Sequence, residues 1–486
     1  MNRAAPRGLK AAVGPVAIGV VAACIVLPGL TAQSVSYDEG VSAAMATARW
    51  PSFAGTAIGG EANMSLYYLL LRCLPPIHPG AAALRAPSAA AFIVAVPLVA
   101  VAGAQLMGRV PGLIGAALVA TNAHVVNSAQ TARSYALLMA LSVASTVLLL
   151  RAGKSQGRHG SAWVLGWGVV SGLTAYVHLL GVVTTAAQVV AVGLAWPRRL
   201  RSLLVGLVAA ALLWAPLGVV ALRQGTASIS WIKKPSLEDL GSVAAEVAGG
   251  VGPLVVIAAA SIWALATKTV AREPAVRFLL AMILVPLAGV YLVSLLGPTP
   301  LLLPRYLIAV APAGALLVGV AVTHASRPVL VAGLAVVAVA GNLHGLVARN
   351  TSSAEDFRAA AEQVNRQARV GDVSAFVDPT AAAAFAVYAR PGAPPSVFPE
   401  IAPGASLYDG RQGLGHIGEE VPDAVRAARA HSRVWVIESH TTTEWAAALE
   451  GRLLAGLENV GYTRHDSRSF PGVRVLLYTA MPQARS

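Results

Sequence analysis

Long apolar runs occupy most of the first 346 residues of this chain. A helix needs about 20 mostly apolar residues to cross roughly 30 Å of hydrocarbon. Charged residues make up only 12% of the chain, whereas soluble domains average about 25%. The sequence therefore predicts a polytopic α-helical membrane protein with about 11 spans, at 11–31, 88–107, 110–123, 134–151, 162–177, 179–196, 202–222, 251–268, 277–296, 305–323 and 328–346.

Basic residues orient these spans. Arg and Lys fall in short loops on one common side, which carries Arg109, Arg151, Arg198, Lys268 and Arg327. Such residues collect in cytoplasmic loops, so the N-terminus is predicted to be cytoplasmic, with 32–87, 124–133, 223–250, 297–304 and everything after 346 outside. The same bias accounts for the net charge of +14, and no basic run interleaved with aromatic residues suggests nucleic-acid binding. A cleaved signal peptide is the alternative for the first run.

Two parts of the chain are not membrane-spanning by this pattern. The first outer loop, 32–87, contains segments 36–50 and 64–72, which we expect to be helices lying in the membrane interface, with Pro51 closing the first. After residue 350 short apolar strands alternate with helical segments, which indicates a small α/β domain. The predicted domains are thus a transmembrane module, 1–350, and an extracytoplasmic domain, 351–486.

Polar residues gather on the predicted outer face. Asp38 and Glu39 directly follow the first span, where an acid is costly unless it is solvated, paired or used. A carboxylate there can take a proton from an attacking hydroxyl, and Arg binds phosphate through two parallel hydrogen bonds. The full set is Asp38, Glu39, Glu61, Asn63, His124, Asn127, Gln130, Arg133, Tyr135, Tyr176, His178, Lys233, Lys234, Arg305 and Tyr306.

Each of these residues also has a structural interpretation. Asp38 and Glu39 can cap the helix that they begin. Arg133 and Arg305 can extend toward lipid headgroups, and His178 can be a hydrogen-bonded turn residue. These alternatives stay open on the residues alone.

Six motifs in this order resemble the GT-C glycosyltransferases. They are Tyr37-Asp38-Glu39, the segment 61–71, Arg85 to Ser88, Gln130 to Tyr135, Tyr176 to His178, and Pro304 to Leu307. The branch they resemble is that of the protein O-mannosyltransferases and aminoarabinose transferases, in its actinobacterial mannosyltransferase form. Many relatives have His-Pro-Pro where this chain has Asn63 to Ser65, and Glu where it has Thr131.

The resemblance implies an inverting transfer of a sugar, mannose above all, from a polyprenyl-phosphate carrier. The acceptor is a hydroxyl of a lipoglycan, glycolipid or protein, and the reaction takes place outside the plasma membrane of a bacterium. Asp38 matches the catalytic acid, with Glu39 beside it, while Arg133, His178, Arg305 and Tyr306 match carrier or sugar contacts. The resemblance assigns support of the acceptor or of the loop to Glu61, Asn63, Tyr67, Gln130 and Tyr135.

Two other functions fit a chain of this kind. A flippase for a lipid-linked sugar would need polar residues at mid-membrane depth and an internal repeat, and the sequence has no evident repeat. A catalytically inactive scaffold would keep the carrier site without the reaction. No metal-ligand spacing is present and no cofactor is indicated; the need for a divalent metal stays open.

Overall fold

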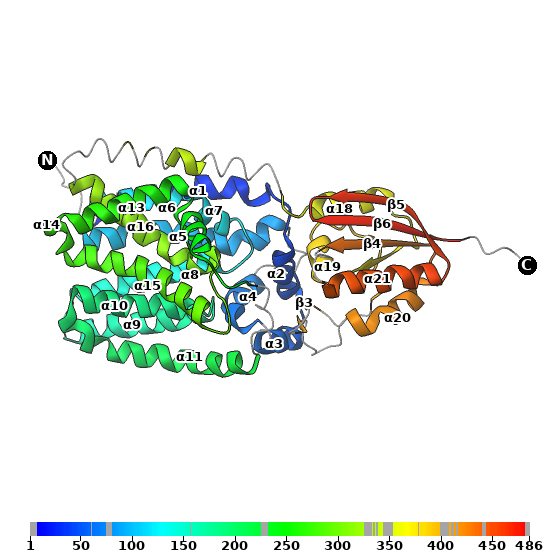
Figure 1. The fold of residues 1–486 in the computed structure, drawn as a ribbon, viewed down its shortest axis with the longest axis horizontal. Helices are drawn as coiled ribbons and strands as arrows, with labels where there is room; N and C mark the ends of the chain where they lie inside the picture. Colours follow the sequence, from blue (N-terminus) through cyan, green and yellow to red (C-terminus); the bar gives the residue numbers. More distant parts are fainter. Residues whose placement is uncertain are drawn as a thin grey trace, which may run out of the picture. The chain divides into compact units, whose positions relative to one another are not determined.

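A computed structural model gives the fold (Figure 1). It describes residues 7–59, 61–73, 80–155, 157–224, 232–324, 333, 336, 339–343, 353–377, 379–398, 408–409, 413–414, 417–439 and 444–481. Two compact units make up the chain. Unit 1 contains Met1–Leu30, Asn63–Tyr67 and Arg85–Arg349, and unit 2 contains Thr31–Ala62, Tyr68–Leu84 and Asn350–Ser486. Most of the predicted first outer loop thus shares a unit with the C-terminal segment.

Unit 1 is a helical bundle. Its α-helices are α1 (Arg7–Val26), α5 (Ala81–Leu106, from Arg85 on), α6 (Arg109–Thr121), α7 (Ala123–Ala129), α8 (Tyr135–Ala152), α9 (Gly157–Ala175), α10 (Gly181–Ala195), α11 (Leu204–Gln224), α12 (Leu237–Ala248), α13 (Val251–Ala266), α14 (Lys268–Ala271), α15 (Pro274–Leu296) and α16 (Ala311–His324). Short 3-10 helices η1 (Leu27–Thr31), η3 (Pro197–Leu203) and η5 (Pro304–Val310) precede or follow them. In Figure 1, α9, α10, α11 and α15 run side by side.

The predicted number of spans was too high. Within the described ranges, six helices are long and apolar enough to cross a membrane, or up to eight if each of two bent pairs is one span. The six are Val13–Thr31, Ala81–Leu106, Tyr135–Ala152, Pro197–Arg223, Pro274–Leu296 and Pro304–His324. Predicted spans 162–177 and 179–196 correspond to α9 and α10, which do not meet these criteria, and 328–346 falls mostly outside the described residues.

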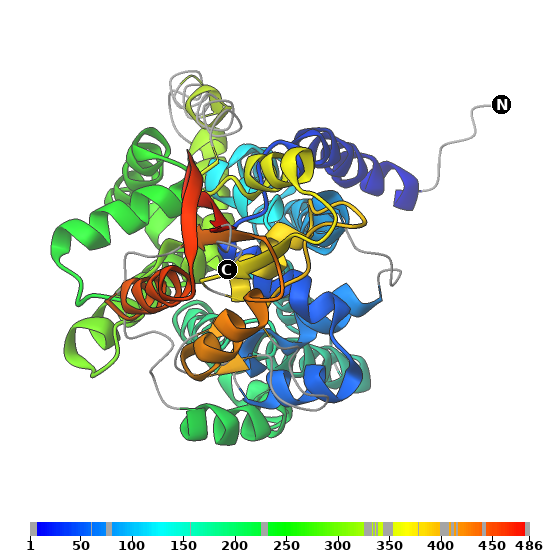
Figure 2. The same ribbon diagram turned by 90° about the vertical axis from the view of Figure 1, so that its right-hand side faces the viewer.

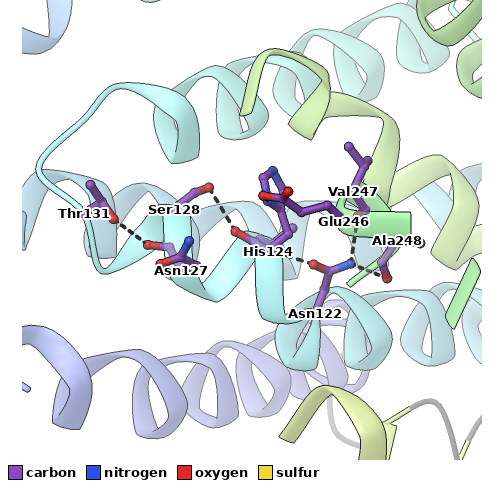
Figure 3. A network of polar contacts seen from close by, with 9 residues as sticks. Asn122, His124, Asn127, Ser128, Thr131, Glu246, Val247 and Ala248 are labelled. Carbon is purple, nitrogen blue, oxygen red and sulfur yellow. Dashed lines mark hydrogen bonds and ion pairs between the residues drawn. The ribbon is translucent and has the colours of Figure 1, made fainter. Parts of the chain in front are cut away.

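Both bent pairs involve an interrupted helix. The axes of α6 and α7 differ by 64°, and those of α12 and α13 by 95°. Asn122 lies at the first break, where its side-chain oxygen accepts from Val125 N at 3.0 Å. Its amide nitrogen donates to the carbonyls of Val247 (3.1 Å) and Ala248 (2.8 Å) at the end of α12 (Figure 3). One side chain therefore satisfies backbone groups at both breaks, which hydrocarbon requires.

A buried polar network joins α8, α9 and α10. The Gln188 amide nitrogen donates to Ser145 Oγ at 2.7 Å and Thr146 Oγ1 at 2.9 Å, and its oxygen accepts from Trp167 Nε1 at 2.7 Å. Gln188 and Trp167 are fully buried. Because its polar atoms are hydrogen-bonded, Gln188 can be buried at little cost, and its bonds link the three helices.

Glycines allow α9 and α11 to approach closely. A Cβ on Gly168 would lie 2.1 Å from the Gly206 carbonyl oxygen, and one on Gly206 would lie 2.6 Å from the Trp167 ring. Because lipid provides no hydrophobic force between helices, membrane helices associate through close packing, and small residues at the contact allow it.

We expect Gly168→Ala to destabilise the bundle by about 1–3 kcal/mol, because the added methyl overlaps backbone that cannot move independently. Thermal unfolding in detergent measures this. Gly218→Ala on α11 is the matched control, since its Cβ meets nothing within 4 Å and Ala is the better helix former. Equal melting temperatures for the two variants would contradict the close contact.

The C-terminal part of unit 2 is an α/β domain, as predicted. Its sheet has the order β1 (Val373–Phe376), β4 (Arg433–Ser439), β6 (Val473–Ala480), β5 (Tyr462–Phe470), with β1 and β4 parallel and the other pairs antiparallel. A small ladder joins β2 (Tyr408–Asp409) to β3 (Gly413–Leu414). The polar edge strand β5 was not predicted, because its exposed residues lack an apolar alternation.

Helices cover both faces of this sheet (Figures 1 and 2). One face packs against α20 (Ile417–Ala428) and α21 (Glu444–Asn459), through Val425, Leu453 and Leu476 among others. The other packs against α18 (Phe357–Gln367) and α19 (Pro379–Ala386). Val35, from the first predicted outer loop, is fully buried in this second core.

The predicted helix 36–50 is present but shorter, and a second helix begins at its last residue. α2 (Tyr37–Thr47) ends before Ala48, and α3 (Trp50–Gly59) contains Pro51 in its first turn, where the missing N–H costs nothing. Pro51 therefore begins a helix instead of closing one. The second predicted segment, 64–72, is α4 (Ser65–Arg72).

Candidate functional site

The acidic pair that follows the first span lies in the first turn of α2, in unit 2. Ser36 is the N-cap, and its backbone N–H donates to the Glu39 carboxylate at 2.9 Å while its Oγ accepts from Glu39 N at 3.4 Å. This reciprocal pair is a capping box. Glu39 is 2% exposed and closes the box, so helix capping accounts for Glu39. Asp38 is half-buried and stands outside the box.

Glu61 is tied to a neighbouring aromatic residue. Its carboxylate accepts from the Tyr68 hydroxyl at 2.6 Å, and its backbone N–H donates to Thr56 O at 3.1 Å. Tyr68 is fully buried and Glu61 half-buried. Glu61 is thus bonded within its own segment of unit 2, and its predicted support of the acceptor or of the loop stays a prediction.

In unit 1, predicted residues from three distant segments meet. Arg133 lies in the turn between α7 and α8, and Tyr135 is the first residue of α8. His178 lies in the turn between α9 and α10, and Arg305 and Tyr306 lie at the start of η5. We refer to these five as the Arg–His–Tyr cluster. The start of α8, the end of α9 and the start of η5 lie together here, because α8 packs against both α9 and η5.

Aromatic rings form the frame of the cluster. The His178 ring lies 4.4 Å from the Tyr306 ring and 5.8 Å from the Tyr135 ring, between centroids. The Arg305 guanidinium lies over both tyrosines, 5.9 Å from Tyr135 and 5.7 Å from Tyr306. Stacking on aromatic faces restricts the orientation of a guanidinium group.

The hydrogen bonding of His178 fixes its tautomer. Its Nδ1 accepts from Leu180 N at 3.2 Å, so the proton of the neutral ring is on Nε2. Burial, with Arg133 and then Arg305 nearby, lowers the pKa of His178 to about 3. The imidazole is therefore a neutral hydrogen-bond donor at physiological pH and not a proton donor.

If the predicted sugar transfer is measured, His178→Gln is expected to keep its rate within about threefold of wild type. The Gln amide nitrogen then replaces the Nε2–H donor. His178→Asn puts its amide near the Nδ1 position and should lower kcat/KM about tenfold, the loss of one hydrogen bond. Transfer assays measure both. We also expect no limb from His178 in the pH–rate profile between pH 5 and 8; a limb that disappears in His178→Gln would contradict the neutral form.

The same lowered pKa affects stability. Below about pH 6.5 the unfolded chain takes up a proton at this imidazole, whereas the folded protein does so only near pH 3, in line with its lowered pKa. The contribution of His178 to the free energy of unfolding is therefore fully present above pH 6.5, and it decreases as the pH falls toward 3.

A hydrogen-bonded chain positions the backbone of Arg133. Ser88 Oγ donates to Arg133 O at 2.8 Å, and the Tyr67 hydroxyl lies 2.9 Å from Ser88 Oγ. Because the Ser88 proton is already used, Tyr67 is the donor. Tyr67 and Ser88 are fully buried. Sequence analysis did not single out Ser88, although it ends the Arg85 to Ser88 motif.

Other predicted residues have structural partners. Gln130 donates to Val26 O at 3.1 Å and joins α7 to the end of α1. Asn63 is half-buried in a 3-10 turn, Ala62–Met64. Tyr176 donates to Leu213 O at 2.8 Å, and Lys233 and Lys234 are exposed.

A separate network lies along α7 (Figure 3). His124 is 6% exposed, and its Nδ1 lies 3.3 Å from the Glu246 carboxylate of α12. Thr131 Oγ1 donates to Asn127 O at 2.9 Å, so its hydroxyl satisfies a carbonyl in the last turn of α7. His124 thus connects α7 to α12, whereas the Thr131–Asn127 bond is local to the end of α7. Over the described part of the chain, no three His, Cys, Asp or Glu side chains gather in a way that could hold a metal ion.

Comparison with known proteins identifies the fold. No family model matches the sequence, and no curated protein matches it. Solved structures do match: ArnT from Cupriavidus metallidurans bound to undecaprenyl phosphate has a TM-score of 0.66 and 13% identity, over 96% of this chain and 99% of ArnT. The chain therefore has the GT-C glycosyltransferase fold, as its motifs predicted, and is a multi-pass membrane protein.

Two further structures share this fold. The oligosaccharyltransferase AglB from Archaeoglobus fulgidus, in complex with an inhibitory peptide and a dolichol-phosphate, has a TM-score of 0.51 and 11% identity over 95% of this chain and 74% of AglB. The arabinofuranosyltransferase AftD from mycobacteria has a TM-score of 0.53 and 15% identity over 96% of this chain, which spans 40% of AftD.

Proposed function

We propose that this protein is an inverting membrane glycosyltransferase that moves a sugar from a polyprenyl-phosphate carrier to a hydroxyl acceptor. The Arg–His–Tyr cluster is the observation that carries the proposal. Two guanidinium groups, a neutral Nε2–H donor and two tyrosines suit a phosphate whose charge increases as the sugar leaves. The structural likeness to ArnT bound to undecaprenyl phosphate agrees with this ligand.

In the proposed reaction the acceptor hydroxyl oxygen attacks the anomeric carbon of the sugar. The bond from that carbon to the phosphate oxygen breaks, and its electron pair stays with the phosphate. The hydroxyl proton goes to the Asp38 carboxylate, the general base. Glu39 holds the helix that carries Asp38, and Arg133, Arg305, Tyr306 and His178 stabilise the departing polyprenyl phosphate.

The ends of the helices support an extracytoplasmic site. The cluster lies where α8 begins and α9 ends, whereas Arg151 and Arg158 lie at the opposite ends of these helices. At that basic end Lys154 donates to Gln105 O at 2.8 Å and Arg277 to Leu194 O at 3.2 Å. Because basic ends favour the cytoplasm, we place the cluster outside the plasma membrane, with the N-terminus inside.

Mannose is the proposed sugar, and a lipoglycan, glycolipid or protein the proposed acceptor, on the family resemblance of the motifs. The deciding experiment compares cell-envelope glycans of a deletion strain complemented with wild type or Asp38→Asn, by mass analysis. Loss of one hexose that only wild type restores supports the proposal. Loss of a pentose would replace mannose with a sugar such as arabinose.

Two outcomes would contradict the proposal that the protein is an enzyme. If the strain complemented with Asp38→Asn has the same cell-envelope glycans as the strain complemented with wild type, the protein is a catalytically inactive scaffold. Reconstituted protein that moves the lipid-linked sugar across liposomes without forming a glycosidic product would identify a flippase.

A further inference from the structure

The segment that leads into α2 is held on the C-terminal domain by α18. The Arg358 guanidinium donates to Thr31 O at 2.6 Å and to Gln33 O at 3.0 Å, and its backbone N–H donates to Ser34 Oγ at 3.1 Å. In return Ser34 N donates to Ser353 Oγ at 3.0 Å. One side chain thus holds two carbonyls of the segment, with charge-assisted bonds stronger than neutral ones.

The next residues are held as well. Val35 N donates to the Tyr388 hydroxyl at 2.8 Å, and the fully buried Val35 side chain packs with Phe357 and Phe385. The Arg358 guanidinium lies 5.4 Å from the Tyr388 ring centroid. Thr31, Gln33, Ser34 and Val35 are therefore held by α18, by Ser353 just before it and by Tyr388 after α19.

The helix itself is anchored at its first residue. The backbone N–H of Tyr37 donates to the Glu355 carboxylate, which is a favourable place for an acid because the helix N-terminus carries partial positive charge. Further along, a Cβ on Gly40 would lie 2.5 Å from Thr380 O and 3.2 Å from the Ala384 Cβ. α2 therefore lies directly on α19, and only glycine allows this approach.

These contacts constrain Asp38 from both sides. The residue before it is bonded to Glu355, and the residue after it closes the capping box with Ser36. A base must be held close to the productive geometry, since a displacement of about 1 Å can cost 10²-fold in rate.

We propose that Glu355 and Arg358 are positioning residues for the base Asp38, so that the C-terminal domain is part of the catalytic apparatus. This rests on the proposed function, in which Asp38 takes the acceptor proton. The C-terminal domain then contributes to the rate of transfer.

The test compares Glu355→Ala with Glu355→Gln in full-length protein in liposomes, using polyprenyl-phosphate mannose as donor. We expect Glu355→Ala to lower kcat about 10- to 100-fold with an unchanged KM for the donor. Glu355→Gln keeps an oxygen that accepts from Tyr37 N–H and should recover most of the rate. Arg358→Ala should behave like Glu355→Ala. Arg366→Ala is the matched control, because Arg366 is an exposed Arg of α18 that pairs with Glu362 of the same helix.

Amide hydrogen exchange gives a readout independent of activity. In Glu355→Ala and Arg358→Ala, the amides of residues 34–39 should exchange faster, while those of β4 and β6 stay protected. If wild type transfers sugar and Glu355→Ala retains the kcat of Arg366→Ala, the positioning role is overturned and the function stands. If wild type transfers no sugar from any polyprenyl-phosphate donor, the proposed function fails and the role of Glu355 in catalysis fails with it.

Discussion

Asp38→Asn is expected to lower sugar transfer by about 10²- to 10⁴-fold, the usual contribution of a general base. Asn has nearly the shape of Asp and keeps a side-chain oxygen, but it cannot take up the acceptor proton. The capping box of α2 uses Ser36 and Glu39, so the helix should stay folded. Initial rates of glycosidic product from polyprenyl-phosphate mannose in liposomes measure the loss.

A second capping box supplies the control for this variant. Ser36 and Glu39 begin α2, and Ser236 and Asp239 begin α12 in the same way. Asp239→Asn weakens the second box, so it should lower the melting temperature slightly and leave the rate of transfer unchanged. If Asp38→Asn instead lowers the melting temperature as Asp239→Asn does and keeps full activity, Asp38 is a helix-terminal residue and not a base.

Arg305→Ala is expected to lower kcat by about 10²- to 10³-fold, as the loss of one preorganised donor to a developing anion does in other enzymes. Arg305 stands over the rings of Tyr135 and Tyr306. Its guanidinium is therefore held before the carrier binds, and less freedom is lost when the phosphate arrives. Product formation and carrier binding, measured separately, distinguish transition-state from ground-state stabilisation.

Two further substitutions are controls for Arg305→Ala: one keeps the positive charge without the guanidinium group, and the other removes an arginine far from the cluster. Arg305→Lys keeps the charge and loses the planar fork, so we expect an intermediate rate. Arg272→Ala removes an exposed Arg at the opposite end of the bundle and should leave transfer unchanged. Equal rates for Arg305→Ala and Arg272→Ala would show that Arg305 only contacts headgroups.

The membrane character of the fold could be read from the sequence, but not the number of spans. The runs that became α5, α8 and α15 are long enough to be recognised without a structure. The run at 110–123 looked like a short span because hydropathy does not register the break at Asn122, which depends on carbonyls of α12. Likewise α10 is apolar but only 15 residues long, because it begins after the turn that contains His178 and ends just before Pro197, where η3 starts.

For the candidate site, residue types were predictable and their partners were not. Arg133, His178 and Arg305 stood out because ions and imidazoles are rare beside apolar runs. Nothing in the sequence shows that Leu180 N fixes the His178 tautomer, or that Ser88 supports Arg133. The contribution of Glu355 and Arg358 was also out of reach, because they are more than 300 residues away from the segment that they hold.

The bond between Asn122 and the end of α12 also has a consequence for biosynthesis. Its acceptor carbonyl on Val247 is 125 residues further along the chain, so it does not yet exist when α6 and α7 leave the ribosome. Until α12 follows, the Asn122 amide must be held by water, by the translocon or by a chaperone, since lipid offers no partner. The contact between the two broken helices can therefore form only after α12 has been synthesised.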